Sequence, residues 1–176
     1  MKFISIYLLT FMSLIGYQSG DYPTPKTKNL LFYIQRNHNA NTIVYDARYD
    51  ANGNLDKKQP IDAYWLRFQE KGQRMELRSF EKWMAYGVDC KKVTGKYDYR
   101  IYLSASKKVV LWLKQIAPFK AEVYAEIKGV TMKLDHMYAT ADESGWVPKI
   151  LYGEFFGTDV NTGEPVHVKV LKKDIK

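Results

Sequence analysis

Strict alternation of apolar and polar residues constrains this chain more than any other feature. In residues 120–128 every even position is Lys, Glu or Tyr, and the odd positions between them are apolar: Ala121, Val123, Ala125 and Ile127. A period of two over nine residues predicts a β-strand with one buried face and one wet face. The same rhythm recurs in residues 98–103, 130–138 and 166–170.

Turn-forming residues separate these segments. Asn and Gly tolerate the positive φ that tight hairpin turns need, and they lie between the predicted strands at 37–41, 52–53, 129 and 161–163. One segment breaks the pattern. Ser79 can start a short helix, Gly87 can end it, and three side chains share one helical face at spacings of three and four: Phe80, Trp83 and Met84. We therefore expect one short helix near residues 80–86.

One helix among many strands with hairpin-length connections predicts a mainly β fold. The expected architecture is an antiparallel up-and-down meander, because consecutive strands are joined by short turns. A meander avoids exposed edges by closing into a barrel or by folding into a sandwich. We favour a calycin-like barrel and keep the sandwich as the alternative.

The N-terminal segment resembles an export signal. Lys2 is followed by an uncharged, mostly apolar run that ends at Tyr17, which is typical of a secretory signal peptide over residues 1–20. The run is shorter than the about 20 apolar residues that span a bilayer, and an uncleaved N-terminal anchor is the alternative. Residues 21–28 contain two prolines and predict an extended leader, residues 29–172 a single β-rich domain, and residues 173–176 a tail.

Composition excludes several classes of protein. The chain is 46% hydrophobic and 15% aromatic, which excludes intrinsic disorder. Cys90 is the only cysteine, so no intramolecular disulfide can form. The net charge is +8, but the lysine doublets fall at predicted turns rather than on one face among stacking aromatics. We therefore expect no nucleic-acid partner, and a weak attraction to anionic envelope components instead.

Several spaced motifs resemble one known family. They are residues 31–37, residues 41–47, Tyr64-Trp65, Ala85-Tyr86-Gly87, residues 152–157 and the turn Asn161-Thr162-Gly163. Together they resemble an exported bacterial family that is catalogued only as a domain of unknown function. The resemblance covers residues 29–172 and implies export in a Gram-negative bacterium and a single domain. It implies no activity, cofactor or catalytic residue.

Motifs of catalysis and metal binding are missing from the sequence. The three histidines His38, His136 and His167 lie far apart, and no H-E-x-x-H occurs. There is no G-x-S-x-G nucleophile elbow, and Cys90 among Asp89, Lys91 and Lys92 is interpreted as part of a solvated basic loop. We assign no catalytic residue, no metal and no cofactor.

His136 is the one histidine that interrupts an apolar face. That face otherwise consists of Val130, Met132, Leu134 and Tyr138, so alternation points His136 and Tyr138 into the interior. A buried imidazole needs a hydrogen-bond partner, and a structural role is its ordinary use. The alternative hypothesis is that His136 and Tyr138 are polar groups that line a ligand cavity.

Aromatic residues supply further candidates for a binding groove: Tyr64, Trp65, Trp83, Tyr86, Trp112 and Trp146. Such rings offer rigid apolar area with a polar tip, although core packing is their commoner role. Arg36 begins an Asn-rich turn, Arg36–Asn41, that could dock on an acidic partner.

The leading functional hypothesis is a non-enzymatic, exported β-domain that binds a small apolar or amphipathic ligand in its interior. Its candidate ligand-binding residues are His136, Tyr138, Arg36, Tyr64, Trp65 and Tyr86. The expected location is the periplasm or the cell surface, with no transmembrane span in the mature chain. One alternative is an envelope module that docks on acidic glycan, lipid or protein through its basic surface. A hydrolase with scattered carboxylates is the other.

Overall fold

The computed structural model describes residues 22–142, 144 and 149–175. Within them, one eleven-stranded sheet makes up most of the fold. The strands are β1 Leu30–Arg36, β2 Asn39–Ala47, β3 Ile61–Arg67, β4 Gln73–Glu76, β5 Val88–Lys92, β6 Tyr99–Leu103, β7 Ser106–Ala117, β8 Lys120–Ile127, β9 Val130–Asp142, β10 Lys149–Asp159 and β11 Pro165–Leu171. The helical segments are η1 Phe68–Glu70, α1 Ser79–Glu81, the π-helical turn η2 Lys82–Tyr86, and α2 Lys172–Ile175. The predicted signal peptide and Trp146 lie outside the described residues.

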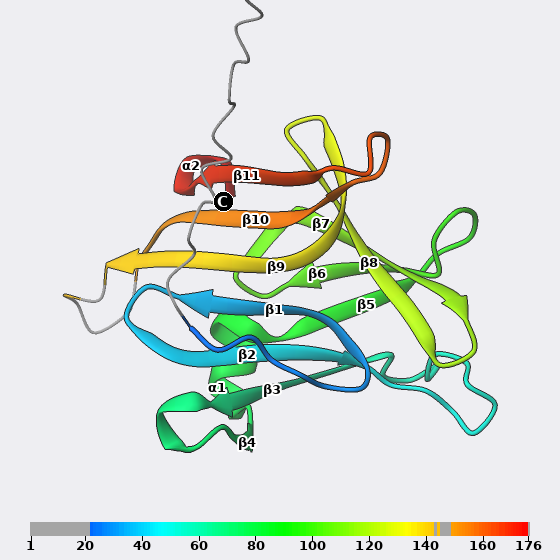
Figure 1. Ribbon diagram of the computed structural model, residues 1–176, viewed down its shortest axis with the longest axis horizontal. Coiled ribbons are helices and arrows are strands. Elements are labelled where there is room, and N and C mark those ends of the chain that lie inside the picture. Colours follow the sequence, from blue (N-terminus) through cyan, green and yellow to red (C-terminus); the bar gives the residue numbers. More distant parts are fainter. Residues whose placement is uncertain (1–21, 143, 145–148, 176) are drawn as a thin grey trace, which may run out of the picture.

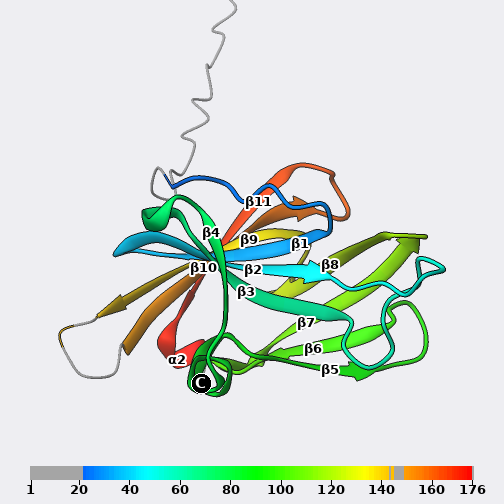
Figure 2. The ribbon, with the colours of Figure 1, turned by 90° about the horizontal axis from the view of Figure 1, so that it is seen from below.

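The sheet branches at β9. One edge of β9 pairs along most of its length with β10, which pairs in turn with β11. The other edge is shared: residues 130–133 pair with β8, and residues 136–139 pair with β1 in parallel. From this branch, β1–β4 form one wall and β8 back to β5 form the other (Figures 1 and 2). The two walls enclose the hydrophobic core.

The fold is mainly β, as predicted, but the predicted closed barrel is wrong. The sheet curls into a half-barrel whose end strands β4 and β5 are not paired with each other. Two features explain the opening. β4 is only four residues long, and the chain between β4 and β5 forms α1 and η2 instead of a hairpin. The short helix predicted near residues 80–86 is therefore present, and it occupies the place where a closing hairpin would be.

Alternation places the core where the sequence predicted it. In β8 the buried side chains are Val123, Ala125 and Ile127, and the intervening residues are half-buried or exposed. β6 alternates in the same way. Lys128 and Gly129 form the turn to β9 and both have positive φ, 51° and 80°. Two such residues in a two-residue loop match a type I′ hairpin, for which Gly129 is suited because it has no Cβ.

The N-terminal leader covers the outer face of β1. Residues 22–27 form neither helix nor strand, and Pro25 is buried. The Gln35 side-chain amide donates a hydrogen bond to the Pro23 carbonyl at 3.2 Å, and the Thr27 hydroxyl donates to the Asp46 carboxylate at 2.6 Å. β1 is consequently buried on both faces, although it belongs to a largely antiparallel sheet.

A β-bulge changes the phase of alternation in β9. Phe156 of β10 pairs with His136, but the next residue, Gly157, pairs with Leu134, so Asp135 is the extra residue. Met132 and Leu134 face the core before the bulge, and Met137 packs against the core after it. The prediction that His136 continues the inward face is therefore wrong, because the extra residue turns its side chain away from the face that carries Met132 and Leu134.

Phe80 and Trp83 of the helical segment are 64% and 76% exposed, and Phe80 and Met84 line a cavity. One further expectation fails, and it concerns Cys90. Cys90 lies on β5 opposite Ile101 and packs against the core, so it is not part of a solvated loop. Among the described residues, no helix is both long enough and apolar enough to cross a membrane.

Candidate functional site

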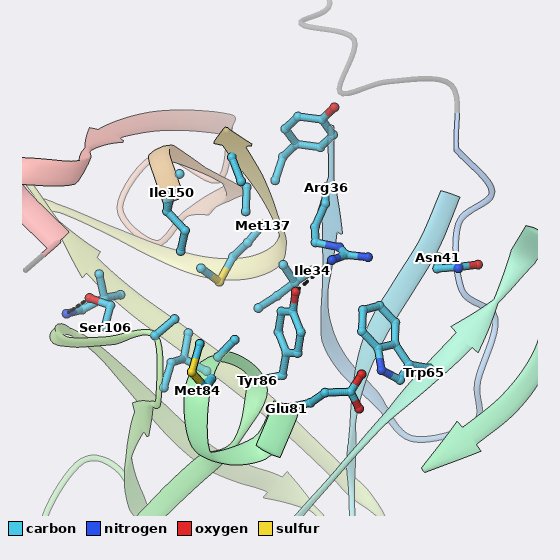
Figure 3. Close-up of a pocket in the computed structure, with 18 of the residues that line it drawn as sticks. Ile34, Arg36, Asn41, Trp65, Glu81, Met84, Tyr86, Ser106, Met137 and Ile150 are labelled. Atoms are coloured by element: carbon cyan, nitrogen blue, oxygen red, sulfur yellow. Dashed lines mark hydrogen bonds between the residues drawn. The ribbon is translucent and has the colours of Figure 1, made fainter. Parts of the chain in front are cut away.

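A cavity of about 520 Å³ opens between the two walls of the half-barrel. Residues from β1, β2 and β3 line one side, η2 and the start of β7 line another, and β9 and β10 close it (Figure 3). Ligand pockets in proteins typically measure about 300–1,000 Å³ and are mostly apolar with a few placed polar groups. The cavity has the size and the lining of a small-molecule site.

The two ends of the cavity differ in chemistry. Met84, Met137 and Ile150 lie at one end, together with Ser106 (Figure 3). The Ser106 hydroxyl accepts a hydrogen bond from the Val109 backbone N–H at 3.4 Å, so this hydroxyl is already engaged with the protein. Apart from Ser106, the labelled side chains at this end are apolar.

The opposite end is polar. Its labelled residues are Arg36, Asn41, Trp65 and Glu81, and Ile34 and the Tyr86 ring lie between the two ends (Figure 3). A cavity with one apolar and one polar end matches the shape of an amphipathic molecule.

Arg36 is the central polar group of this end. Its Nη1 donates a hydrogen bond to the Tyr86 hydroxyl at 3.1 Å, and its Nη2 donates to Asn39 Oδ1 at 3.4 Å. The guanidinium carbon lies 4.9 Å from the centre of the Trp65 ring and 5.9 Å from that of the Tyr86 ring. Contacts of a cation with aromatic faces offset part of its desolvation cost.

Packing and a hydrogen bond hold the aromatic side chains Trp65 and Tyr86 in place. Trp65 is almost fully buried and meets Tyr86 edge to face, with ring centres 5.2 Å apart. The buried Tyr45 hydroxyl donates a hydrogen bond to the Tyr86 carbonyl at 3.0 Å, which ties η2 to β2. Burial raises the pKa of Tyr45, so this hydroxyl stays protonated and remains a donor. The walls around Arg36 are thus set before any ligand arrives.

Asn41 and Arg67 also line the polar end of the cavity, and each interacts with other protein groups. Asn41 and Gln69 exchange two hydrogen bonds of 3.2 Å, and Asn41 also donates its backbone N–H to Asn39 Oδ1 at 3.0 Å. Arg67 forms an ion pair with Glu70. The Arg67 charge is therefore paired with a carboxylate, whereas both hydrogen-bond acceptors of Arg36 are uncharged.

The structure brings four of the six predicted site residues to this cavity and separates the other two. Arg36, Trp65, Tyr86 and Tyr138 are among the lining residues, whereas Tyr64 and His136 are not. Tyr64 precedes Trp65 in β3 and so faces the other side of the sheet, where its hydroxyl donates to Asp46 at 2.7 Å. Its burial and this hydrogen bond raise the pKa of Tyr64. Its role there is structural.

His136 belongs to a ladder of four stacked rings on the outer face. Tyr33, His136, Phe156 and His167 come from β1, β9, β10 and β11, and successive ring centres are 4.9, 4.5 and 4.4 Å apart. His167 Nε2 lies 3.1 Å from Glu154 Oε1. The ladder bridges the parallel contact between β1 and β9 and continues to the last strand. His136 therefore helps to hold the branched sheet together.

Among the described residues, groups that could hold a metal ion or act as a nucleophile are sparse at this cavity. No three His, Cys, Asp or Glu side chains within residues 22–142, 144 and 149–175 gather closely enough to hold a metal ion. Among those residues, Glu81 alone brings a carboxylate to the cavity. Burial and the Asp89 carboxylate raise the pKa of the Cys90 thiol to about 12, so almost no thiolate exists at neutral pH.

Sequence reasoning missed several lining residues. Arg67, Met137 and Gly153 were not candidates, and Asn41 was named only as the end of the Arg36–Asn41 docking turn, yet all four line the cavity. Met137 was hidden because the bulge at Asp135 reverses its face. Arg67 offered a usable signal: it lies two residues after Trp65 in the same strand, and such positions share a face.

Comparison with known proteins identifies the family. The family model described as a domain of unknown function, DUF4833, matches residues 32–169, which is most of the chain. The chain belongs to this family. No curated protein and no solved structure gives a significant match. Membership in DUF4833 confirms the resemblance seen in the sequence, and it brings no activity with it.

Proposed function

We propose that this DUF4833 protein binds a small amphipathic ligand, without converting it, in the cavity between β1, β3, β9 and η2. One observation carries the proposal: a cavity of about 520 Å³ with an apolar end at Met84, Met137 and Ile150 and a polar end at Arg36. Burial of the apolar part supplies most of the binding free energy. The polar end fixes the orientation of the ligand. Export through residues 1–20 to the periplasm or cell surface is part of the same proposal.

Filling the cavity is expected to abolish binding. Ala139 lines the cavity and pairs with Arg36 and Gly153 on its two sides, so Ala139→Phe adds a ring on the side of β9 that lines the cavity. We expect the affinity for the uncharged probe N-phenyl-1-naphthylamine, measured by its fluorescence, to fall at least about tenfold. Ala51→Phe, at an exposed turn, is the matched control and should bind like the wild type.

The thermal unfolding midpoint of Ala139→Phe separates loss of binding from loss of fold. A folded Ala139→Phe variant that binds the probe as tightly as the wild type would place the binding site elsewhere and contradict the proposal.

Docking on an anionic lipid surface is the second candidate function. Phe80 and Trp83 are the most exposed large hydrophobic residues described, and they lie on one short helical segment. Arg78 and Lys82, also exposed, flank them, and Phe80 also lines the cavity. Tryptophan beside basic residues is typical of groups that sit at a membrane interface. A lipid surface fits this patch better than a glycan, because the aromatic side chains need an apolar layer.

Removal of Trp83 tests this second candidate. We expect the wild type to sediment with vesicles that contain phosphatidylglycerol, and Trp83→Ala to bind them about tenfold more weakly because the indole no longer enters the bilayer interface. Ile116→Ala, another exposed apolar residue but on β7, is the control. Equal binding of the vesicles by the wild type and Trp83→Ala would contradict docking of the Phe80 and Trp83 side chains on a lipid surface.

A further inference from the structure

We propose that the ligand of this cavity carries a carboxylate and that Arg36 binds that group. The inference rests on the proposed function and adds the chemical class of the ligand. It starts from the Arg36 guanidinium, which carries five N–H donors. Its two hydrogen bonds go to the Tyr86 hydroxyl and to the Asn39 side-chain oxygen, and both acceptors are uncharged. Among the described residues, no carboxylate forms an ion pair with Arg36.

Other arginines of the same wall are neutralised by the protein itself. Arg67 pairs with Glu70, and Arg74 lies 2.7 Å from Asp62 and 2.9 Å from Glu76. Arg36, like Arg67, is half-buried and lines the cavity, but it differs because no carboxylate among the described residues pairs with it. A cation in such surroundings is costly unless an anion joins it. The face of Trp65 offsets only part of that cost, since a ring quadrupole is weaker than a full negative charge.

Glu81 is the one acidic side chain among the described lining residues, and it is engaged elsewhere. Its carboxylate accepts a hydrogen bond of 2.7 Å from the backbone N–H of Arg78, at the first turn of α1. It therefore caps the helical segment. Among the described residues no ion pair joins Glu81 to Arg36, and in the proposal the ligand supplies the anion.

The geometry selects the kind of anion. A guanidinium presents parallel N–H groups that match the two oxygens of a carboxylate. From Arg36 the cavity continues past the Tyr86 ring to Met84, Met137 and Ile150 (Figure 3). A carboxylate at the Arg36 end thus leaves an alkyl chain in the apolar end. A fatty-acid-like monocarboxylate fits both ends of the cavity.

The test compares three probes of equal chain length and different charge. Laurate, dodecanol and dodecyltrimethylammonium are titrated below their micelle concentrations against wild-type protein that holds N-phenyl-1-naphthylamine. We expect laurate to bind at least about tenfold more tightly than dodecanol, and the cation to bind most weakly. In Arg36→Met the advantage of laurate should disappear while the affinity for dodecanol stays within about twofold. Arg36→Lys should restore part of the advantage, because it keeps the charge but not the planar fork.

The outcomes separate this inference from the proposed function. Equal binding of laurate and dodecanol by the wild type would overturn the carboxylate assignment and leave ligand binding intact. Equal weakening of both probes in Arg36→Met would assign Arg36 a structural role and overturn the inference. Failure of all three probes to displace N-phenyl-1-naphthylamine from the wild type would overturn the carboxylate assignment, and failure of N-phenyl-1-naphthylamine itself to bind would overturn both proposals. The wild-type comparison needs no variant, so the test holds even if Arg36→Met does not fold.

Discussion

Replacement of Gly157 by valine is expected to lower the free energy of unfolding by more than about 4 kcal/mol or to prevent folding. A Cβ at this position would lie 2.2 Å from the Lys133 carbonyl oxygen, 3.1 Å from its carbon and 3.3 Å from Leu134 Cα. All three are backbone atoms of β9, so no side-chain rotation relieves the clash. The pairing of β9 with β10 would have to open beside the bulge at Asp135. Urea unfolding followed by circular dichroism measures the effect.

Gly163→Ala is the matched control. Gly163 has a φ of 75° and open space around the position of an added Cβ, so this variant bears only the strain of the left-handed backbone. We expect a cost of about 1–2 kcal/mol. Equal unfolding midpoints for Gly157→Val and Gly163→Ala would show that β9 and β10 do not approach each other as closely as described.

Phe32→Ala is expected to destabilise the protein by about 3–5 kcal/mol. Phe32 is fully buried, and its ring stacks on Tyr45 with centres 4.3 Å apart and planes 9° from parallel. Tyr45 in turn holds the Tyr86 carbonyl. The cavity left by Phe32 therefore loosens the support of the ligand cavity as well as the core. Urea unfolding gives the stability, and probe titration of the folded fraction should show weaker binding.

Phe80→Ala removes the same ring from the surface. Phe80 is 64% exposed, and its loss should change the free energy of unfolding by no more than about 0.5 kcal/mol. Similar costs for Phe32→Ala and Phe80→Ala would contradict the placement of the core.

Local patterns predicted local structure well. The alternation of Val123, Ala125 and Ile127 predicted a strand with the correct buried face, and Gly129 predicted the turn that follows it. Strands and turns of this kind depend on residues that are close together in the sequence, so the sequence alone contains the information that specifies them. Closure of the barrel depends instead on whether β4 and β5, at opposite ends of the sheet, meet each other. No local pattern contains that information.

The candidate site was predicted only in part. Arg36, Trp65 and Tyr86 come from β1, β3 and η2, and the sequence marked each without indicating that they meet. Tyr64 was grouped with Trp65, although adjacent strand residues face opposite sides; the alternation rule itself could have separated them. His136 could not have been corrected in this way, because nothing in the sequence of its segment marks Asp135 as the extra residue of a bulge.

Sequence patterns alone specified that the protein is rich in β-strands, where most of its turns lie and which residues form its hydrophobic core. Each of these features depends on side chains that are only a few positions apart in the chain. Tertiary structure decided which way β9 faces after Asp135, that the half-barrel stays open, and that Arg36 borders the cavity with no ion-pair partner among the described residues. Those outcomes depend on the register between distant strands. Register is set by the packing of the whole sheet.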